Sequence, residues 1–383
     1  MKRIREAGME AELSLLKSGF LPDNVCTKLN SDYLDLEDCL SQLPKLLTTR
    51  TFKQEVSKLQ IYTKFDSLTI AELERAMLLY SYLGHAYMWG EEETPISIPE
   101  NVSRPWVEIS NLLNRPPILS YASYALNNWV SIQANKKVLE VEDIIILQNF
   151  LGGVDEDWFI MIHVAIEFEA QNLLYSLGQY FITKEKDENL EEALESINKI
   201  NKIMDRMPEH CDPYIYYNRV RPYIFGWKNN PATPNGVIYE GVEEFSNKPK
   251  FFRGETGAQS SIIPAVDALL GVSHSDDPLR FYLDEMREYM PFEHRELLNK
   301  LDYWRNKEND KGDQLNREKN SLDLIAEIIS EVKHFRNTHL TFAKDYIHTQ
   351  SEDAKTNSNS VGTGGTPFMQ YLEKHLDETV PHG

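Results

Sequence analysis

A helical repeat of apolar residues dominates this chain and is clear at 321–347. The apolar side chains of this segment recur at steps of three and four residues, which places them on one face of an α-helix. They are Ile325, Ile328, Val332, Phe335, Phe342 and Tyr346. Strand-like alternation is scarce elsewhere, and the short run 237–239 is its best candidate. The pattern therefore predicts an all-α fold.

One histidine interrupts the apolar face of this segment. His339 lies in the middle of the face, whereas His334 falls on the opposite, more polar face with Glu327 and Glu331. An inward histidine is either a core residue bonded to a backbone carbonyl or a single imidazole ligand of a metal, such as a haem iron. The pattern alone favours the core residue.

The charge of the chain argues against several classes of partner. The 383 residues carry 60 acidic and 40 basic side chains, for a net charge of −20. This field repels phosphate backbones, so we expect no nucleic acid partner. No run of about eighteen apolar residues occurs, and the segment 1–20 has neither the apolar core nor the cleavage site of a signal peptide. We therefore expect no membrane association.

The cysteines indicate the compartment. Cys26, Cys39 and Cys211 are odd in number and widely spaced, and no CxxCH haem-attachment motif is present. This arrangement suits neither a disulfide framework nor a zinc site. We expect a cytoplasmic protein, and the sequence does not decide between a monomer and a homo-oligomer.

The helical pattern also suggests where the chain divides. We expect helices over 69–89, 118–130 and 141–151, the last of them stopped by Gly152 and Gly153. A domain boundary near 150 then separates a small helical N-terminal domain, 1–150, from a large one, 151–383. The polar segment 349–365 has almost no apolar content and is predicted to be a mobile loop over a pocket or a plain linker.

Two further segments carry candidate site residues. We expect a buried helix over 158–181, because its run 158–168 is apolar except for His163 and Glu167. These two residues are one helical turn apart, so they share either a function or an internal hydrogen-bond network. Tyr214, Tyr217 and Arg221 share a face at α-helical spacing. The guanidinium of an arginine on an aromatic face pairs with a protein acid or with a ligand carboxylate.

Five segments in the right order resemble the indoleamine 2,3-dioxygenase family. They are RPYIFGWKNNPATPNGVIYEG at 221–241, GAQSSIIPAVDALLG at 257–271, MREYMPFEHRELL at 286–298, HFRNTHL at 334–340 and GTGGT at 362–366, with a weaker likeness from 116 to 126. The resemblance implies a small and a large helical domain that together hold haem b. Such enzymes use ferrous haem and O2 as co-substrate to cleave the indole C2–C3 bond of tryptophan, giving N-formylkynurenine. The resemblance thus favours the haem-ligand interpretation of His339 over the core residue.

The resemblance also assigns roles to other residues. Arg221 matches the arginine that binds the substrate carboxylate, and Tyr216 and Tyr217 stand where the family has two phenylalanines that pack on the indole. Tyr121 matches a tyrosine of the distal pocket, and Thr363 a threonine of the mobile loop. On the haem side, the matching residues are the polar pair Asp267 and Arg336 and the small-residue segment Thr256, Gly257 and Ala258.

The chain departs from the family pattern on the distal side. His163 stands where the family commonly has serine, and this resembles the tryptophan 2,3-dioxygenases, in which a distal histidine accepts the indole N–H bond. We therefore expect His163 to act in catalysis on a small indole substrate. Two alternatives remain: another indole oxidation or rearrangement in secondary metabolism, and a haem- or indole-binding protein without turnover.

Overall fold

The computed structural model describes residues 14–132, 139–183, 187–272, 278–309, 319–353, 362–365 and 368–379, and its architecture is helical as predicted. The α-helices are α2 (Leu34–Ser41), α3 (Leu43–Thr48), α4 (Phe52–Val56), α5 (Ile70–Trp89), α6 (Glu100–Leu112), α7 (Val154–Thr183), α8 (Glu188–Asp205), α9 (Met207–His210), α10 (Pro213–Ile215), α11 (Arg221–Ile224), α12 (Ile262–Leu270), α13 (Pro278–Arg287), α14 (Phe292–Asn309), α15 (Lys319–Ala343), α16 (Thr349–Asp353) and α17 (Phe368–Glu378). Short 3-10 turns are η1 (Ser31–Tyr33), η3 (Val141–Asp143), η5 (Glu243–Phe245) and η6 (Gly257–Gln259).

Strands in the described residues form only two short pairs. β1 (Ser97–Ile98) pairs in parallel with β4 (Ile238–Tyr239), so the strand expected at 237–239 is present. β2 (Trp129–Ser131) and β3 (Ile144–Ile146) pair antiparallel, with Val130 opposite Ile145. Each pair fastens one loop to another, and neither forms a layer of the core.

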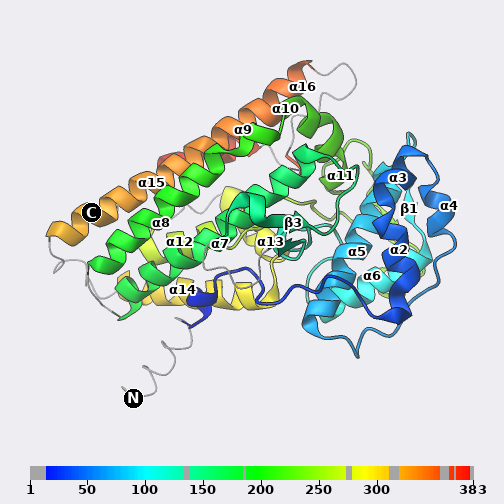
Figure 1. Ribbon diagram of the computed structural model, residues 1–383, viewed down its shortest axis with the longest axis horizontal. Coiled ribbons are helices and arrows are strands. Elements are labelled where there is room, and N and C mark those ends of the chain that lie inside the picture. Colours follow the sequence, from blue (N-terminus) through cyan, green and yellow to red (C-terminus); the bar gives the residue numbers. More distant parts are fainter. Residues whose placement is uncertain are drawn as a thin grey trace.

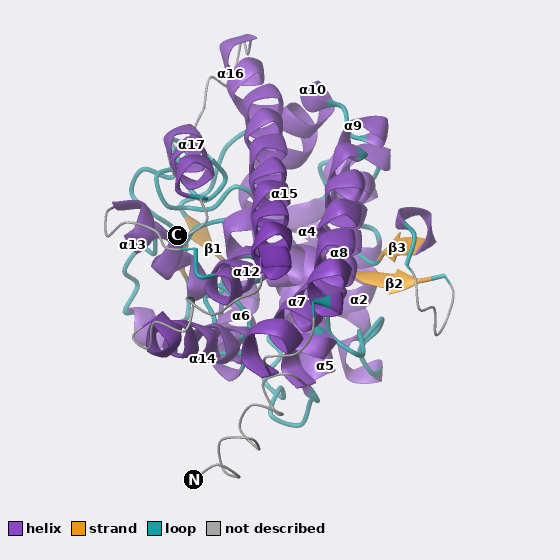
Figure 2. Cartoon of the chain, turned by 90° about the vertical axis from the view of Figure 1, so that its left-hand side faces the viewer, coloured by secondary structure: helices purple, strands orange, loops and turns teal. Residues whose placement is uncertain are grey.

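The longest helices lie side by side and form the frame of the larger part of the molecule. α7, α8 and α15 run along one another, and α17 packs on α15 (Figures 1 and 2). α7 is apolar on nearly all sides because it is covered by α8, α12 and the π-helical turn η2 (Ala122–Leu126). The helices predicted at 158–181 and 321–347 are therefore confirmed.

The N-terminal helices gather at the other end of the molecule, where α5 is the central element (Figure 1). A capping box opens α5: the Thr69 side chain accepts from the Glu72 backbone N–H, and the Glu72 carboxylate accepts from the Thr69 N–H at 2.9 Å. The helix is then buried from Leu73 to Ala86, as expected for 69–89. The domain boundary near 150 lies just before α7 and stays a prediction.

Two expected helices are wrong. The segment 141–151 forms η3 and then strand β3, and 118–130 contains only the five-residue turn η2 before β2 begins. Three consecutive β-branched residues at 144–146 favour the extended backbone, and pairing with β2 satisfies their hydrogen bonds. Helical periodicity in a short apolar run could not separate the two conformations.

Three π-helical turns occur in the described residues, and each lies next to or includes a residue that lines the cavity described below. They are η2, η4 (Tyr216–Val220) and η8 (Lys344–His348). A π turn inserts one extra residue per turn and shifts the side chains that follow it, and it often occurs at functional sites. η4 explains a wrong expectation: Tyr214 is 64% exposed, whereas Tyr217 and Arg221 are fully buried, so the three do not share a face.

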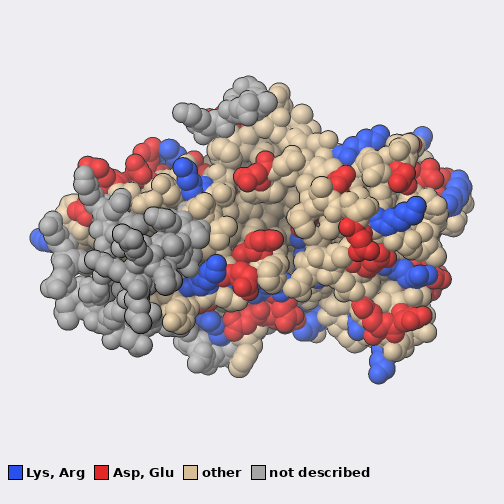
Figure 3. Space-filling view, turned by 90° about the horizontal axis from the view of Figure 1, so that it is seen from below, with Lys and Arg blue, Asp and Glu red and all other residues tan. Residues whose placement is uncertain are grey.

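Three further features of the molecule concern its surface charges, its helices and its cysteines. Acidic and basic side chains intermingle on the face seen in Figure 3. No helix in the described ranges is both long enough and apolar enough to cross a membrane. Cys26, Cys39 and Cys211 are all free thiols.

Candidate active site

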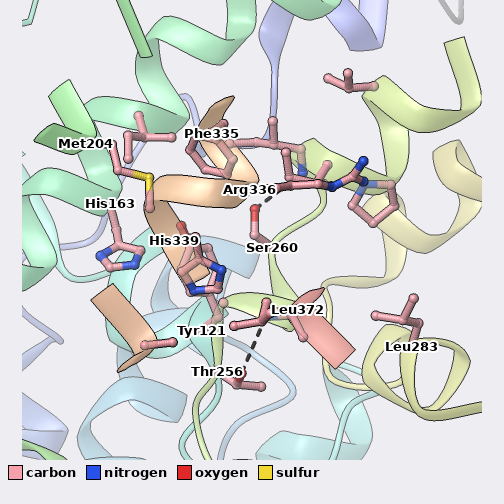
Figure 4. Close-up of a pocket in the computed structure, with 18 of the residues that line it drawn as sticks. Tyr121, His163, Met204, Thr256, Ser260, Leu283, Phe335, Arg336, His339 and Leu372 are labelled. Carbon is pink, nitrogen blue, oxygen red and sulfur yellow. Dashed lines mark hydrogen bonds between the residues drawn. The ribbon is translucent and has the colours of Figure 1, made fainter. Parts of the chain in front are cut away.

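A cavity of about 310 Å³ lies among α7, α8, α12, α13 and α15 (Figure 4). Its size is that of a small-molecule site. Apolar side chains form much of the wall, among them Ile166 and Leu173 of α7, Ile200 and Met204 of α8, and Phe335 of α15. The segments 255–258 and 362–363 close another side. The cavity therefore brings together residues from distant parts of the sequence.

His339 reaches the cavity from α15 (Figure 4). The side chain of His339 is only partly exposed, and no hydrogen bond to its imidazole is found among the described residues. Burial, and secondarily the charge that His163 would carry, lower the pKa of His339 to about 4. The ring is therefore neutral near pH 7 and keeps a lone pair for a metal. A Cβ added to Gly257 would lie 4.0 Å from its Nε2, so glycine leaves space beside the imidazole.

His163 faces the same cavity from α7, as Figure 4 shows. Its Nδ1 lies 2.7 Å from the carbonyl oxygen of Phe159, one turn earlier. A carbonyl accepts only, so Nδ1 carries the proton and Nε2 is left as an acceptor. Burial lowers the pKa of His163, which keeps the ring neutral at pH 7. His163 can thus accept a hydrogen bond from an N–H group inside the cavity.

Tyr121, Glu167 and Ser260 form a hydrogen-bonded group next to His163. The Tyr121 ring packs edge-on against the His163 ring, with centroids 5.9 Å apart. The Ser260 hydroxyl donates to Glu167 at 2.8 Å, and the Tyr121 side chain hydrogen-bonds both of them. Burial raises the pKa of Glu167 to about 7. Glu167 therefore belongs to an internal network and does not line the cavity, whereas Tyr121 does.

The two tyrosines predicted to contact an indole lie at different depths. Tyr216 lines the cavity and packs on Phe159, with ring centroids 4.8 Å apart. Tyr217 and Arg221 are fully buried and are not among the lining residues. The Arg221 guanidinium lies 5.1 Å from the ring centres of both Tyr217 and Phe225. Burial lowers the pKa of Arg221, and the two tyrosines counteract this.

Two loop segments named by the resemblance, 256–258 and 362–365, reach the cavity. Thr256, Gly257 and Ala258 line the cavity, and Thr363 does so from the chain segment 362–365. The Thr363 hydroxyl donates to the carbonyl of Glu255, and its own carbonyl accepts from the Gly226 N–H at 3.2 Å. Residues 349–353 are helical as α16, and 354–361 of the predicted loop lie outside the described residues.

Asp267 and Arg336 form an ion pair across α12 and α15. The Arg336 Nη2 lies 2.6 Å from the Asp267 Oδ2, and both side chains are buried at the cavity wall. Arg336 also donates to Thr379. No cluster of three or more potential protein ligands for a metal ion is found in the described part of the chain.

One site residue was missed by the reasoning from sequence. Glu255 lines the cavity and is only 3% exposed. Burial raises the pKa of its carboxyl to about 8. The available signal was its isolation, because Glu255 is the sole acidic residue between 246 and 266.

Comparison with known proteins decides the family. Residues 14–382 match the family model for indoleamine 2,3-dioxygenase. The chain belongs to the indoleamine 2,3-dioxygenase family. Indoleamine 2,3-dioxygenase of Saccharomyces cerevisiae is 30% identical over 416 residues, which cover 94% of this chain and 90% of the relative.

Two other relatives show the range of the family. Indoleamine 2,3-dioxygenase 1 of Rattus norvegicus is 32% identical, covering 88% of this chain and 86% of the relative. Indoleamine 2,3-dioxygenase nanC of Aspergillus nanangensis is 27% identical, covering 98% and 97%. Membership in this haem-dependent family makes the protein a dioxygenase, and hence an oxidoreductase.

Proposed function

We propose that the protein inserts both atoms of O2 across the indole C2–C3 bond of L-tryptophan or a related indole amine, with haem b as cofactor. The product is then of the N-formylkynurenine type. The observation that carries the proposal is the pair of neutral imidazoles facing one cavity. His339 has no hydrogen-bond partner among the described residues, and His163 presents a free Nε2 acceptor.

The residues on the α15 side fit a haem. The Nε2 of His339 is available as the proximal ligand, and the space beside Gly257 leaves room for a flat ring system. Apolar walls from α8 and α15 suit the porphyrin, and the Asp267–Arg336 pair fixes the polar edge of the wall. Bound haem supplies the ferrous iron at which O2 is activated.

The residues on the α7 side bind and orient the indole. The Nε2 of His163 accepts the indole N–H, and Tyr121 and Tyr216 pack on the ring. Arg221 pairs with the substrate carboxylate. This requires the side chains of Tyr216 and Tyr217 to move so that the carboxylate can reach the buried guanidinium. Thr363 fastens the segment 362–365 over the cavity by its bond to the Glu255 carbonyl, which excludes water.

A turnover assay tests this proposal. Reduced, haem-loaded protein is incubated with L-tryptophan and O2, and the products are separated by chromatography and identified by mass. We expect an N-formylkynurenine whose two added oxygen atoms both come from labelled O2. Absence of ring-opened product from tryptophan, tryptamine and substituted tryptophans would contradict the proposal.

A second candidate is another indole oxidation within the same fold. It is favoured by His163 and by the hydroxyl of Tyr216, which make the cavity wall more polar than phenylalanine and serine would. Incorporation of a single oxygen atom, or a product that keeps the pyrrole ring, distinguishes this reaction from ring cleavage in the same assay.

A further inference from the structure

The acidic residues of the cavity wall differ in their pairing. Four carboxylates line the cavity in the part of the chain that the structure describes: Glu255, Asp267, Asp284 and Asp302. Arg336 pairs with Asp267 at 2.6 Å, Arg287 with Asp302 at 2.7 Å, and Arg280 with Asp284 at 3.3 Å. Neither a hydrogen bond nor an ion pair from the described residues reaches the Glu255 carboxylate. Glu255 is thus the acid that lacks a protein cation.

The backbone holds Glu255 in this position. Its N–H donates to the carbonyl of Ile224 at 3.1 Å, and its carbonyl accepts from the Thr363 hydroxyl. Gly254 before it packs so closely on the chain at 224–226 that an added Cβ would lie 2.3 Å from the Ile224 oxygen. The side chain of Glu255 therefore cannot turn out to solvent without breaking contacts on both sides.

Two cations of the neighbouring segments are already engaged elsewhere. Arg253 donates to Glu285 at 2.7 Å and to the carbonyl of Gly364 at 2.6 Å. Lys228 pairs with the same Glu285 at 2.6 Å. Burying a carboxylate charge without a partner costs several kcal/mol, and Glu255 avoids this cost by keeping its proton, in line with its pKa of about 8. A ligand that brings a positive charge would lower this pKa and pair with the ionised carboxylate.

The surroundings of Glu255 place such a ligand next to the indole site. Glu255 lines the same cavity as Tyr121 and Tyr216, and its charge raises the pKa of both hydroxyls. The charge of Arg221 lowers the pKa of the Tyr216 hydroxyl. An amino acid bound along Tyr216 could therefore present its carboxylate to Arg221 and its ammonium to Glu255.

We propose that Glu255 binds the ammonium group of the substrate and makes the site selective for indole amines. This inference rests on the proposed indole substrate and adds the residue that determines selectivity among indoles. L-Tryptophan and tryptamine both carry an ammonium group that can pair with the Glu255 carboxylate. Indole-3-propionate has the same ring and a carboxylate but no ammonium, so it leaves Glu255 unpaired and is disfavoured.

Binding to the haem-loaded protein tests the proposal without turnover. The Soret shift and the heat of binding are measured under nitrogen for L-tryptophan, tryptamine and indole-3-propionate, with wild type, Glu255→Gln and Asp284→Asn. Glutamine keeps the shape of the side chain and removes its charge. Asp284→Asn removes one charge from the same cavity at a residue that already has an arginine partner.

We expect Glu255→Gln to weaken the binding of tryptophan and of tryptamine about 10- to 100-fold, which is the effect of losing one charge-assisted hydrogen bond. Indole-3-propionate should bind both proteins equally or the variant more tightly, and Asp284→Asn should match wild type. Equal weakening of all three ligands in Glu255→Gln would overturn the proposal, because it would indicate a structural role.

The wild-type ligand series gives a second measurement that needs no variant. Binding of indole-3-propionate as tight as that of tryptamine would also overturn the proposal. Because these readouts are equilibrium binding, amine selectivity without any ring-opened product would support the role of Glu255 and at the same time contradict the proposed reaction.

Discussion

Two helices of this protein each direct a histidine inward, and only one of the two imidazoles is hydrogen-bonded at both ring nitrogens. In α5, the His85 Nδ1 donates to the carbonyl of Tyr223 at 2.6 Å, and its Nε2 accepts from the Leu119 N–H at 3.1 Å. In α15, His339 makes no hydrogen bond to any described residue and faces a cavity. Both rings are neutral, since burial lowers their pKa values to about 3 and about 4.

The difference separates a structural histidine from a candidate ligand. His85 ties three distant segments together and packs on Trp227, with ring centroids 4.8 Å apart. His339 has its lone pair unused and open space beside it. The core interpretation that the sequence pattern favoured for His339 describes His85 instead.

Replacing His339 should have the largest effect. We expect His339→Ala to lose five-coordinate haem and all turnover, while the fold survives because the imidazole bonds to no described residue. Haem content is measured by the Soret band, and folding of the haem-free protein by circular dichroism. A wild-type haem spectrum in the variant would falsify the ligand assignment.

Replacing His85 should affect stability instead. His85→Ala leaves the Tyr223 carbonyl and the Leu119 N–H buried without partners and opens space beside Trp227, so we expect a loss of about 3 kcal/mol. Urea unfolding of the haem-free protein gives the free energy. The folded fraction should bind haem normally. Loss of haem at unchanged stability would remove the distinction between the two histidines.

Replacing Arg221 should act on the substrate alone. We expect Arg221→Ala to weaken L-tryptophan binding about 30-fold, the value of one charged hydrogen bond, with haem content unchanged. Tryptamine, which has no carboxylate, serves as the matched ligand, and its binding affinity should change little. An equal loss for both ligands would show that Arg221 acts by packing on Tyr217 and Phe225.

The pH dependence of stability should show the smallest effect. Both folded-state pKa values lie below the unfolded value of 6.5, so the unfolded chain takes up protons first as the pH falls. The contribution of each histidine to the free energy of unfolding of the haem-free protein should therefore decrease below pH 6.5, by on the order of 1 kcal/mol at pH 5.5. The buried carboxyls of Glu167 and Glu255, whose pKa values are raised, act in the opposite direction, so the test is the difference between wild type and His85→Gln. Urea unfolding at pH 7.5 and 5.5 should show that wild type loses more stability, or gains less, than His85→Gln over this range. An identical change in both proteins would contradict the lowered pKa of His85.

The sequence determined the elements whose own pattern is strong. The helices at 69–89, 158–181 and 321–347 were predicted because a long apolar period or a capping box acts within a single segment. The same pattern failed at 141–151, where pairing with β2 decides the conformation, and at Tyr214, where a π turn shifts the register. Short segments take their structure from their neighbours.

The candidate site divides in the same way. Residue order and motif alone pointed to His339, His163, Arg221, Asp267 and Arg336, and the structure brings most of them to one cavity wall. Only the tertiary structure distinguished His339 from His85 and set Arg221 and Tyr217 behind Tyr216. It also left Glu255 as the one lining acid without a cation among the described residues. Pairing depends on which groups meet across the chain, and that information resides in the packing of α7, α12 and α15.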